Sequence, residues 1–194
     1  MTTKRLLITG FDAFGEQDVN PSWLAVQALP DQVGDFELCK LQIPTIFGTA
    51  AKAVLEAAEA LQPHVILCVG QAGGRAAVTP ERIAVNIRDA RIPDNAGNQP
   101  AGEAVAPNGP AAYFTTVPVK EMAQAIRDAR IPGTVSNSAG AFVCNDVLYS
   151  LLHHYAGTDT RVGFIHVPYI PRQGSPSLPL EQTAAALKAA IQVL

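Results

Sequence analysis

The chain has 194 residues, a net charge of −3, 48% hydrophobic residues and 16% charged residues, which suits a single domain over residues 1–194 with one substantial core. Its lysines and arginines are scattered, and no apolar stretch approaches the ~20 residues that span a membrane, so we expect neither nucleic acid nor a membrane as a partner. Three cysteines without close pairing, and no charged-then-apolar leader, argue against a secreted disulfide scaffold and predict a cytoplasmic protein.

Strand-like and helical patterns alternate along the chain. We expect strands at residues 5–9 (stopped by Gly10), 36–41, 65–69, 83–87 and 162–167. We expect helices at residues 20–29, 48–62, 119–130, 143–155 and 180–194, the first beginning with Asn20 as N-cap and Pro21. This alternation predicts a three-layer α/β/α sandwich with a mixed, largely parallel central sheet.

Two segments do not fit regular elements. Residues 90–110 are polar and rich in Gly, Pro and Asn, and they are too many for a simple connection, so we expect either disorder or a functional loop. Residues 70–75 form a glycine-rich loop after a strand, but they lack the Lys-Ser/Thr of a P-loop and the spacing of a dinucleotide fingerprint. No Cys-x-x-Cys or His-Glu-x-x-His run occurs, so we expect no metal and no cofactor.

Cys144 lies in the opening turn of a predicted helix that Gly157 ends. Unpaired backbone N–H groups at a helix N-terminus favour an anion and can lower the pKa of a thiol, which makes Cys144 a candidate nucleophile. The alternative is a small buried residue that fills the core. Cys39 and Cys68 lie in strand-like runs typical of packing residues, and Cys68 is the second candidate because it stands two residues before Gly70.

His166 is the candidate base. It ends an apolar strand and precedes a proline-rich segment, and open α/β sheets build their sites beyond the carboxyl ends of strands. His64 belongs to the amino end of a strand instead. His153 and His154 lie nine and ten residues along the helix from Cys144, which places their backbones roughly 14 Å away.

Three separated blocks resemble the signatures of the pyroglutamyl peptidase I family, also called pyrrolidone-carboxylate peptidase. They are residues 79–86 (TPERIAVN), 138–145 (SAGAFVCN) and 163–169 (GFIHVPY). The resemblance extends to residues 10–15, 20–22, 69–74 and 90–95, so it covers essentially the whole chain. It implies a single catalytic domain that removes an N-terminal pyroglutamyl residue from peptides.

The resemblance implies that Cys144 is the nucleophile, that His166 is the general base and acid, and that Glu81 is the group that orients the histidine. It further implies a slot for the flat, uncharged lactam ring, and it suggests that these enzymes are commonly homotetramers. The slot residues implied by the resemblance are Phe11, Phe14, Thr45, Gln71 (through its backbone), Arg91, Ile92, Phe142 and Val143.

The chain departs from the family pattern at four positions beside the expected site. Ala13 and Glu16 stand where proline and glycine are usual, and Asn137 and Ala141 replace tyrosine and threonine. Two other functions stay open at this point. One is a phosphorylase-like enzyme that binds phosphate at residues 70–75, and the other is a non-catalytic module that binds a small amide.

Overall fold

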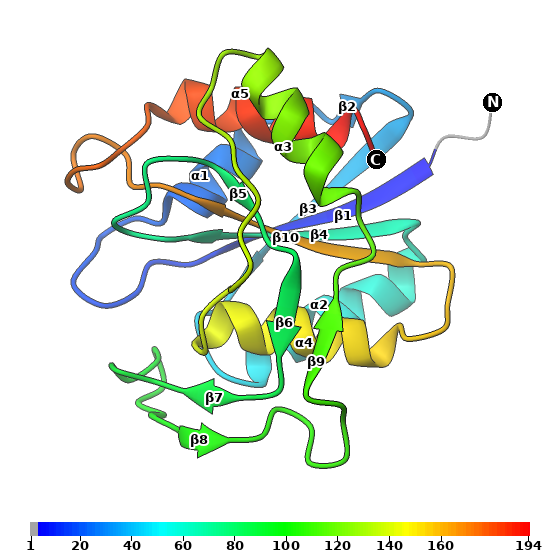
Figure 1. Cartoon of the computed structure of the whole chain (residues 1–194), viewed down its shortest axis with the longest axis vertical. Coiled ribbons are helices and arrows are strands. Elements are labelled where there is room, and N and C mark those ends of the chain that lie inside the picture. Colours follow the sequence, from blue (N-terminus) through cyan, green and yellow to red (C-terminus); the bar gives the residue numbers. More distant parts are fainter. Residues whose placement is uncertain (1–3) are drawn as a thin grey trace.

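The computed structural model describes residues 4–194, which form a six-stranded sheet between two layers of helices (Figure 1). The strand order is β2-β3-β1-β4-β10-β5, in which the four central strands are parallel and the edge strands β2 and β5 are antiparallel. The strands are β1 (Lys4–Phe11), β2 (Gln32–Val33), β3 (Phe36–Ile43), β4 (Val65–Gln71), β5 (Thr79–Pro80) and β10 (Arg161–Val167). The predicted mixed, largely parallel sheet is confirmed.

Helices cover both faces of this sheet and complete the predicted three layers. One layer holds α1 (Pro21–Gln27), α3 (Val119–Asp128) and α5 (Leu180–Ile191), and the other holds α2 (Thr49–Leu61) and α4 (Val143–His154) (Figure 1). Successive side chains of a strand point to opposite faces, so Leu6 and Ile8 of β1 join one core while Leu7 joins the other. Within residues 4–194, none of the helices has the length and apolarity that a membrane crossing requires.

Two small ribbons lie outside the main sheet, beside α4. One pairs β6 (Ile83–Val85) with β9 (Ala112–Phe114), and the other pairs β7 (Arg88–Asp89) with β8 (Ala101–Glu103). The strand predicted at residues 83–87 is therefore shorter and belongs to a separate ribbon. Residues 90–110 are folded and contain β8. The sequence did not predict this strand, because the Gly- and Pro-rich segment has no period-two pattern of apolar residues.

Gly10 does not stop the first strand, contrary to the prediction. β1 continues through Gly10 to Phe11, and a Cβ added at Gly10 would lie 2.6 Å from Cα of Trp23 in α1. Gly10 is thus required because the first turn of α1 packs directly on the strand. The predicted ends of α1, α3 and α5 are two to three residues too late, as is usual for helix termini.

Candidate active site

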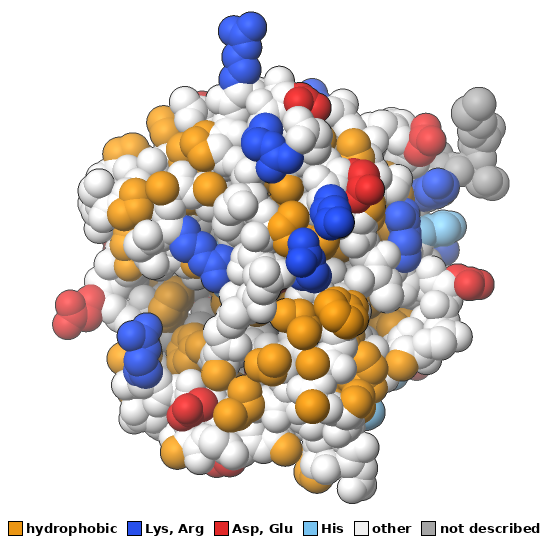
Figure 2. All heavy atoms as spheres, in the orientation of Figure 1, with side chains coloured by type: hydrophobic (Ala, Val, Ile, Leu, Met, Phe, Trp, Pro, Cys, Tyr) orange, Lys and Arg blue, Asp and Glu red, His pale blue; other side chains and the backbone are white. Residues whose placement is uncertain are grey.

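The predicted site residues gather where the parallel strands end. Phe11 ends β1, Gln71 ends β4, and His166 is the penultimate residue of β10. They line a cavity of about 390 Å³ together with Cys144, and the surface is hollowed at this edge of the sheet (Figure 2). This is the edge at which open α/β folds place their ligands, because loops from neighbouring strands diverge there.

Glu81 and His166 are in direct contact. Nδ1 of His166 lies 2.7 Å from Oε1 of Glu81, and the Glu81 side chain is fully buried. β5 runs antiparallel beside β10, and the N–H of Glu81 donates to the Phe164 carbonyl at 2.9 Å. The backbone pairing therefore fixes the carboxylate beside the ring, across 85 residues of sequence.

Cys144 is the second residue of α4, as the helical pattern predicted. No side chain caps this helix at Phe142 in the described structure, so the N–H groups of its first turn remain available to a ligand. The sulfur lies against the end of β4, since a Cβ added at Gly70 would be 2.8 Å from Sγ. Gly70 of β4 is the register partner of His166 of β10. The thiol packs against β4 and the imidazole belongs to the neighbouring strand, so both groups line the same cavity.

Burial disfavours the charged forms of both the Cys144 thiol and the His166 imidazole. Burial raises the pKa of Cys144 to about 12, with the Glu81 charge adding to it, whereas the sequence led us to expect a lowered value. Burial also lowers the pKa of His166, against the opposing hydrogen bond and charge of Glu81. Residues 4–194 show no hydrogen bond between Sγ and the His166 ring, and such contacts commonly tighten only when substrate binds.

Glu81 remains ionised despite its burial. Burial by itself would raise the pKa of the carboxyl, but hydrogen bonding and the charge of His166, with further hydrogen bonds from Ser136 and Arg75, outweigh it and lower the pKa. Arg75 was not singled out by the sequence, where it appears as an ordinary arginine in a glycine-rich loop. Its Nη1 donates to Oε1 of Glu81 at 2.6 Å.

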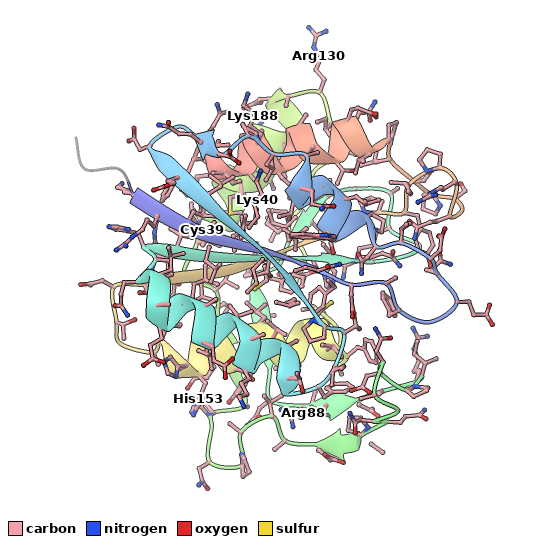
Figure 3. All side chains as sticks on the ribbon, turned by 180° about the vertical axis from the view of Figure 1, so that it is seen from behind. Cys39, Lys40, Arg88, Arg130, His153 and Lys188 are labelled. Carbon is pink, nitrogen blue, oxygen red and sulfur yellow. The ribbon has the colours of Figure 1, made fainter. Side chains whose placement is uncertain are left out.

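The other histidines and cysteines lie elsewhere, as predicted. Nδ1 of His64 accepts from the Arg5 N–H at the amino end of β1, and His153 contacts the Tyr113 hydroxyl at 2.8 Å on the outer side of α4 (Figure 3). Cys68 is fully buried in the core, and burial raises the pKa of its thiol to about 12. Cys39 lies on β3 (Figure 3).

The cavity has an aromatic wall. The rings of Phe14 and Phe142 lie 6.1 Å apart, and Phe47 packs edge-on against Phe142 at 5.3 Å. Seven of the eight predicted slot residues line the cavity, namely Phe11, Phe14, Thr45, Gln71, Arg91, Ile92 and Phe142. Val143 differs, because its side chain is completely buried in the core between the sheet and the α2–α4 layer.

Polar contacts hold this wall together. The Asp12 carboxylate accepts from the Thr45 N–H at 2.7 Å and from the Asn95 amide at 3.2 Å. Asp94 is buried, and it accepts from the N–H groups of Phe47 at 2.9 Å and Asn98 at 2.8 Å. The loop that carries Arg91 and Ile92 is thereby tied to the β1 and β3 ends, which the sequence did not indicate.

Comparison with known proteins identifies the chain's relatives. A family model described as pyroglutamyl peptidase matches residues 4–194. The chain is 50% identical to a pyrrolidone-carboxylate peptidase of Levilactobacillus brevis, covering 98% of this chain and 97% of the relative, and 49% identical to one of Escherichia fergusonii, covering 97% and 91%.

Solved structures agree with this relationship. Pyroglutamyl peptidase I of Bacillus amyloliquefaciens superposes with a TM-score of 0.94 at 46% identity, covering 98% of this chain and 96% of that one. A mutant pyrrolidone carboxyl peptidase (A199P) from P. furiosus gives 0.93 at 39% identity, covering 97% of each. The expected family is thus confirmed, and the chain belongs to the pyroglutamyl peptidases.

Proposed function

We propose that this chain is a cysteine exopeptidase that removes an N-terminal pyroglutamyl residue from peptides, with residues 1–194 as one catalytic domain. Cys144 is the nucleophile, His166 the general base and acid, and Glu81 the residue that orients His166. The observation that carries the proposal is the buried 2.7 Å contact of Glu81 with His166, whose strand partner Gly70 touches Sγ of Cys144.

The reaction begins with the neutral thiol and imidazole. Because Oε1 of Glu81 accepts from Nδ1 of His166, the other ring nitrogen, Nε2, is the unprotonated one that receives the thiol proton. Sγ then bonds to the carbonyl carbon that joins pyroglutamate to the next residue. Glu81 stabilises the imidazolium that results, which offsets the cost of creating charge inside a buried site.

The oxyanion forms at the amino end of α4. The N–H groups of its first turn carry partial positive charge and donate to the oxygen, a contribution whose loss typically costs about 3 kcal/mol. His166 then gives its proton to the departing amine as the C–N bond breaks. Water attacks the thioester with His166 again as base, which releases pyroglutamate and restores the Cys144 thiol.

Specificity comes from the shape and polarity of the cavity. A pyroglutamyl group is flat and uncharged, so it gains from packing against the aromatic wall formed by Phe14 and Phe142, whose rings contact each other at 6.1 Å. Its lactam N–H and carbonyl need a few polar partners, which Thr45 and the Gln71 backbone supply from the ends of β3 and β4. Arg91 and Ile92 close the opposite side, which gives the long loop its function.

The decisive experiment uses a chromogenic pyroglutamyl amide. Cys144→Ser should abolish turnover while circular dichroism shows an unchanged fold, and Cys39→Ser, on the central part of β3, should retain wild-type turnover. Retained turnover by Cys144→Ser would refute the assignment. Alkylation mapped by mass spectrometry should modify Cys144 and inactivate the enzyme in proportion.

The remaining expectations belong to the same proposal. We propose a cytoplasmic location, supported by three unpaired cysteines that a reducing compartment would preserve. Homotetrameric assembly rests on the family resemblance alone, and light scattering of the purified protein tests it. A monomer with full activity would show that no neighbouring copy is needed to complete the site.

A further inference from the structure

Arg75 joins three parts of the site that are distant in sequence. Its Nη1 donates to Oγ1 of Thr79 at 2.5 Å and to Oε1 of Glu81 at 2.6 Å, and its Nη2 donates to the Ser138 carbonyl at 3.0 Å. Thr79 lies on β5 beside His166, and Ser138 precedes the turn into α4 that carries Cys144. The guanidinium thus contacts the base through the Glu81 carboxylate and the segment leading to the nucleophile through the Ser138 carbonyl.

The charge balance of the site depends on this contact. The Glu81 carboxylate is fully buried, and burial disfavours the protonated form of its partner His166. A guanidinium stays protonated at every pH at which proteins fold. Arg75 is therefore the permanent cation that touches the carboxylate within the described residues, and one oxygen, Oε1, accepts from both Arg75 and His166.

We propose that Arg75 is a positioning residue that holds Oε1 of Glu81 against His166 and whose fixed positive charge sets the pH range in which Cys144 is a thiolate. With the carboxylate alone, the site would carry a negative charge that opposes formation of a second anion at Sγ. Arg75 cancels that charge without competing with His166 for the thiol proton, because a guanidinium has no free lone pair that accepts it.

The groups around the pair are consistent with this role. The charges or thiols that act on Sγ of Cys144 are those of Glu81, Cys68 and Arg75, and the cavity is also lined by His166, Asp89 and Arg91. Among the charges that act on both Cys144 and His166, those of Glu81 and Arg75 are opposite in sign. The charge of Arg75 lowers the pKa of both groups, although burial remains the largest influence on each.

The test measures the thiolate directly, so it does not depend on the proposed substrate. In a Cys39→Ser background, the rate of Cys144 alkylation by iodoacetamide is compared at fixed pH values between about 7 and 9 for wild type, Arg75→Lys and Arg75→Gln. Below the thiol pKa, a rise of about one pH unit in that pKa lowers the thiolate fraction about tenfold, so Arg75→Gln should be alkylated about tenfold more slowly, while Arg75→Lys should stay close to wild type. An unchanged rate in Arg75→Gln, or equal losses in both variants, would overturn the proposal.

A second pair of variants covers the case in which Arg75→Gln fails to fold. Glu81→Gln and the double variant Glu81→Gln/Arg75→Gln contain no unpaired buried carboxylate and differ only in the charge at position 75, so the double variant should be alkylated more slowly at the same pH. Identical rates in that pair would also overturn the inference.

The role in catalysis rests on the proposed function and has its own measurement. Both limbs of the kcat profile with a pyroglutamyl amide should move to higher pH in Arg75→Gln, because the lost charge had lowered the pKa of thiol and imidazole alike. If wild type hydrolyses no pyroglutamyl amide but Arg75→Gln is alkylated more slowly, the proposed function fails while the role of Arg75 stands. If wild type is active and the alkylation rates of wild type and Arg75→Gln coincide, the inference about Arg75 fails alone.

Discussion

Substitution of Gly70 by alanine tests whether the position of Sγ controls catalysis. The added Cβ would lie 2.8 Å from Sγ of Cys144 and 2.8 Å from Cζ of Phe164, whereas relaxed contacts are about 3.5–4.0 Å. The backbone at Gly70 does not have a positive φ, so alanine adds no conformational strain there. Relief therefore requires both Sγ and the Phe164 ring to move away from position 70 by about 1 Å.

The magnitude follows from which neighbour moves. The clash with the completely buried Phe164 is relieved by repacking and lowers stability, whereas the clash with Sγ, which faces the cavity, displaces the reacting atom and lowers the rate. A misplacement of about 1 Å costs on the order of 100-fold in rate, and overpacking of this kind costs about 1–3 kcal/mol of stability. We expect kcat on a pyroglutamyl amide to fall about 100-fold in Gly70→Ala, while the protein remains folded at 25 °C.

Gly163→Ala is the matched control. Its Cβ would meet Cγ2 of Val117, 2.4 Å away and outside the catalytic cavity, so it overpacks the protein without touching Sγ. Urea titration should show destabilisation in both variants, with kcat reduced only in Gly70→Ala. A wild-type kcat in Gly70→Ala, or an equal loss of kcat in Gly163→Ala, would refute the view that position 70 must be glycine to leave room for Sγ of Cys144.

Three further predictions concern the loop and the buried charges. Asp94→Ala should raise KM several-fold with less change in kcat. The substitution leaves the N–H groups of Phe47 and Asn98 unpaired, which costs about 1–3 kcal/mol each and releases the loop beside the substrate slot. Steady-state kinetics measures this, and an unchanged KM would contradict it. Arg88→Met should lower the free energy of unfolding by about 3–5 kcal/mol, because it removes the guanidinium whose Nε lies 2.6 Å from the buried Asp146 carboxylate and leaves that charge, among residues 4–194, with only the Gly48 N–H as a partner. Arg88 is labelled in Figure 3, and a loss below about 1 kcal/mol in urea titration would count against this. Because burial lowers the pKa of His166, the unfolded chain binds more protons than the folded chain between that lowered pKa and about pH 6.5. Stability should therefore decrease as the pH falls through this window, and more steeply in wild type than in His166→Gln; parallel curves would disprove it.

Local patterns in the sequence were sufficient for most elements and for two of the site residues. Helical spacing of apolar residues identified α4 and placed Cys144 in its first turn, and a continuous apolar run placed His166 at the end of β10. Both depend on periodicity within a dozen residues, which is a property of the local chain. Motif resemblance extended this to Glu81, for which the local sequence offered no physical signal.

Contacts between distant segments were decided by the tertiary structure alone. Strand order and register brought Glu81 to His166 and Gly70 to Cys144, and no local pattern encodes which strands become neighbours. The pKa of Cys144 shows the same limit. The helix terminus in the sequence pointed to a lowered value, but enclosure by the cavity wall and the nearby carboxylate raise it, because desolvation and charge depend on what surrounds an atom in space.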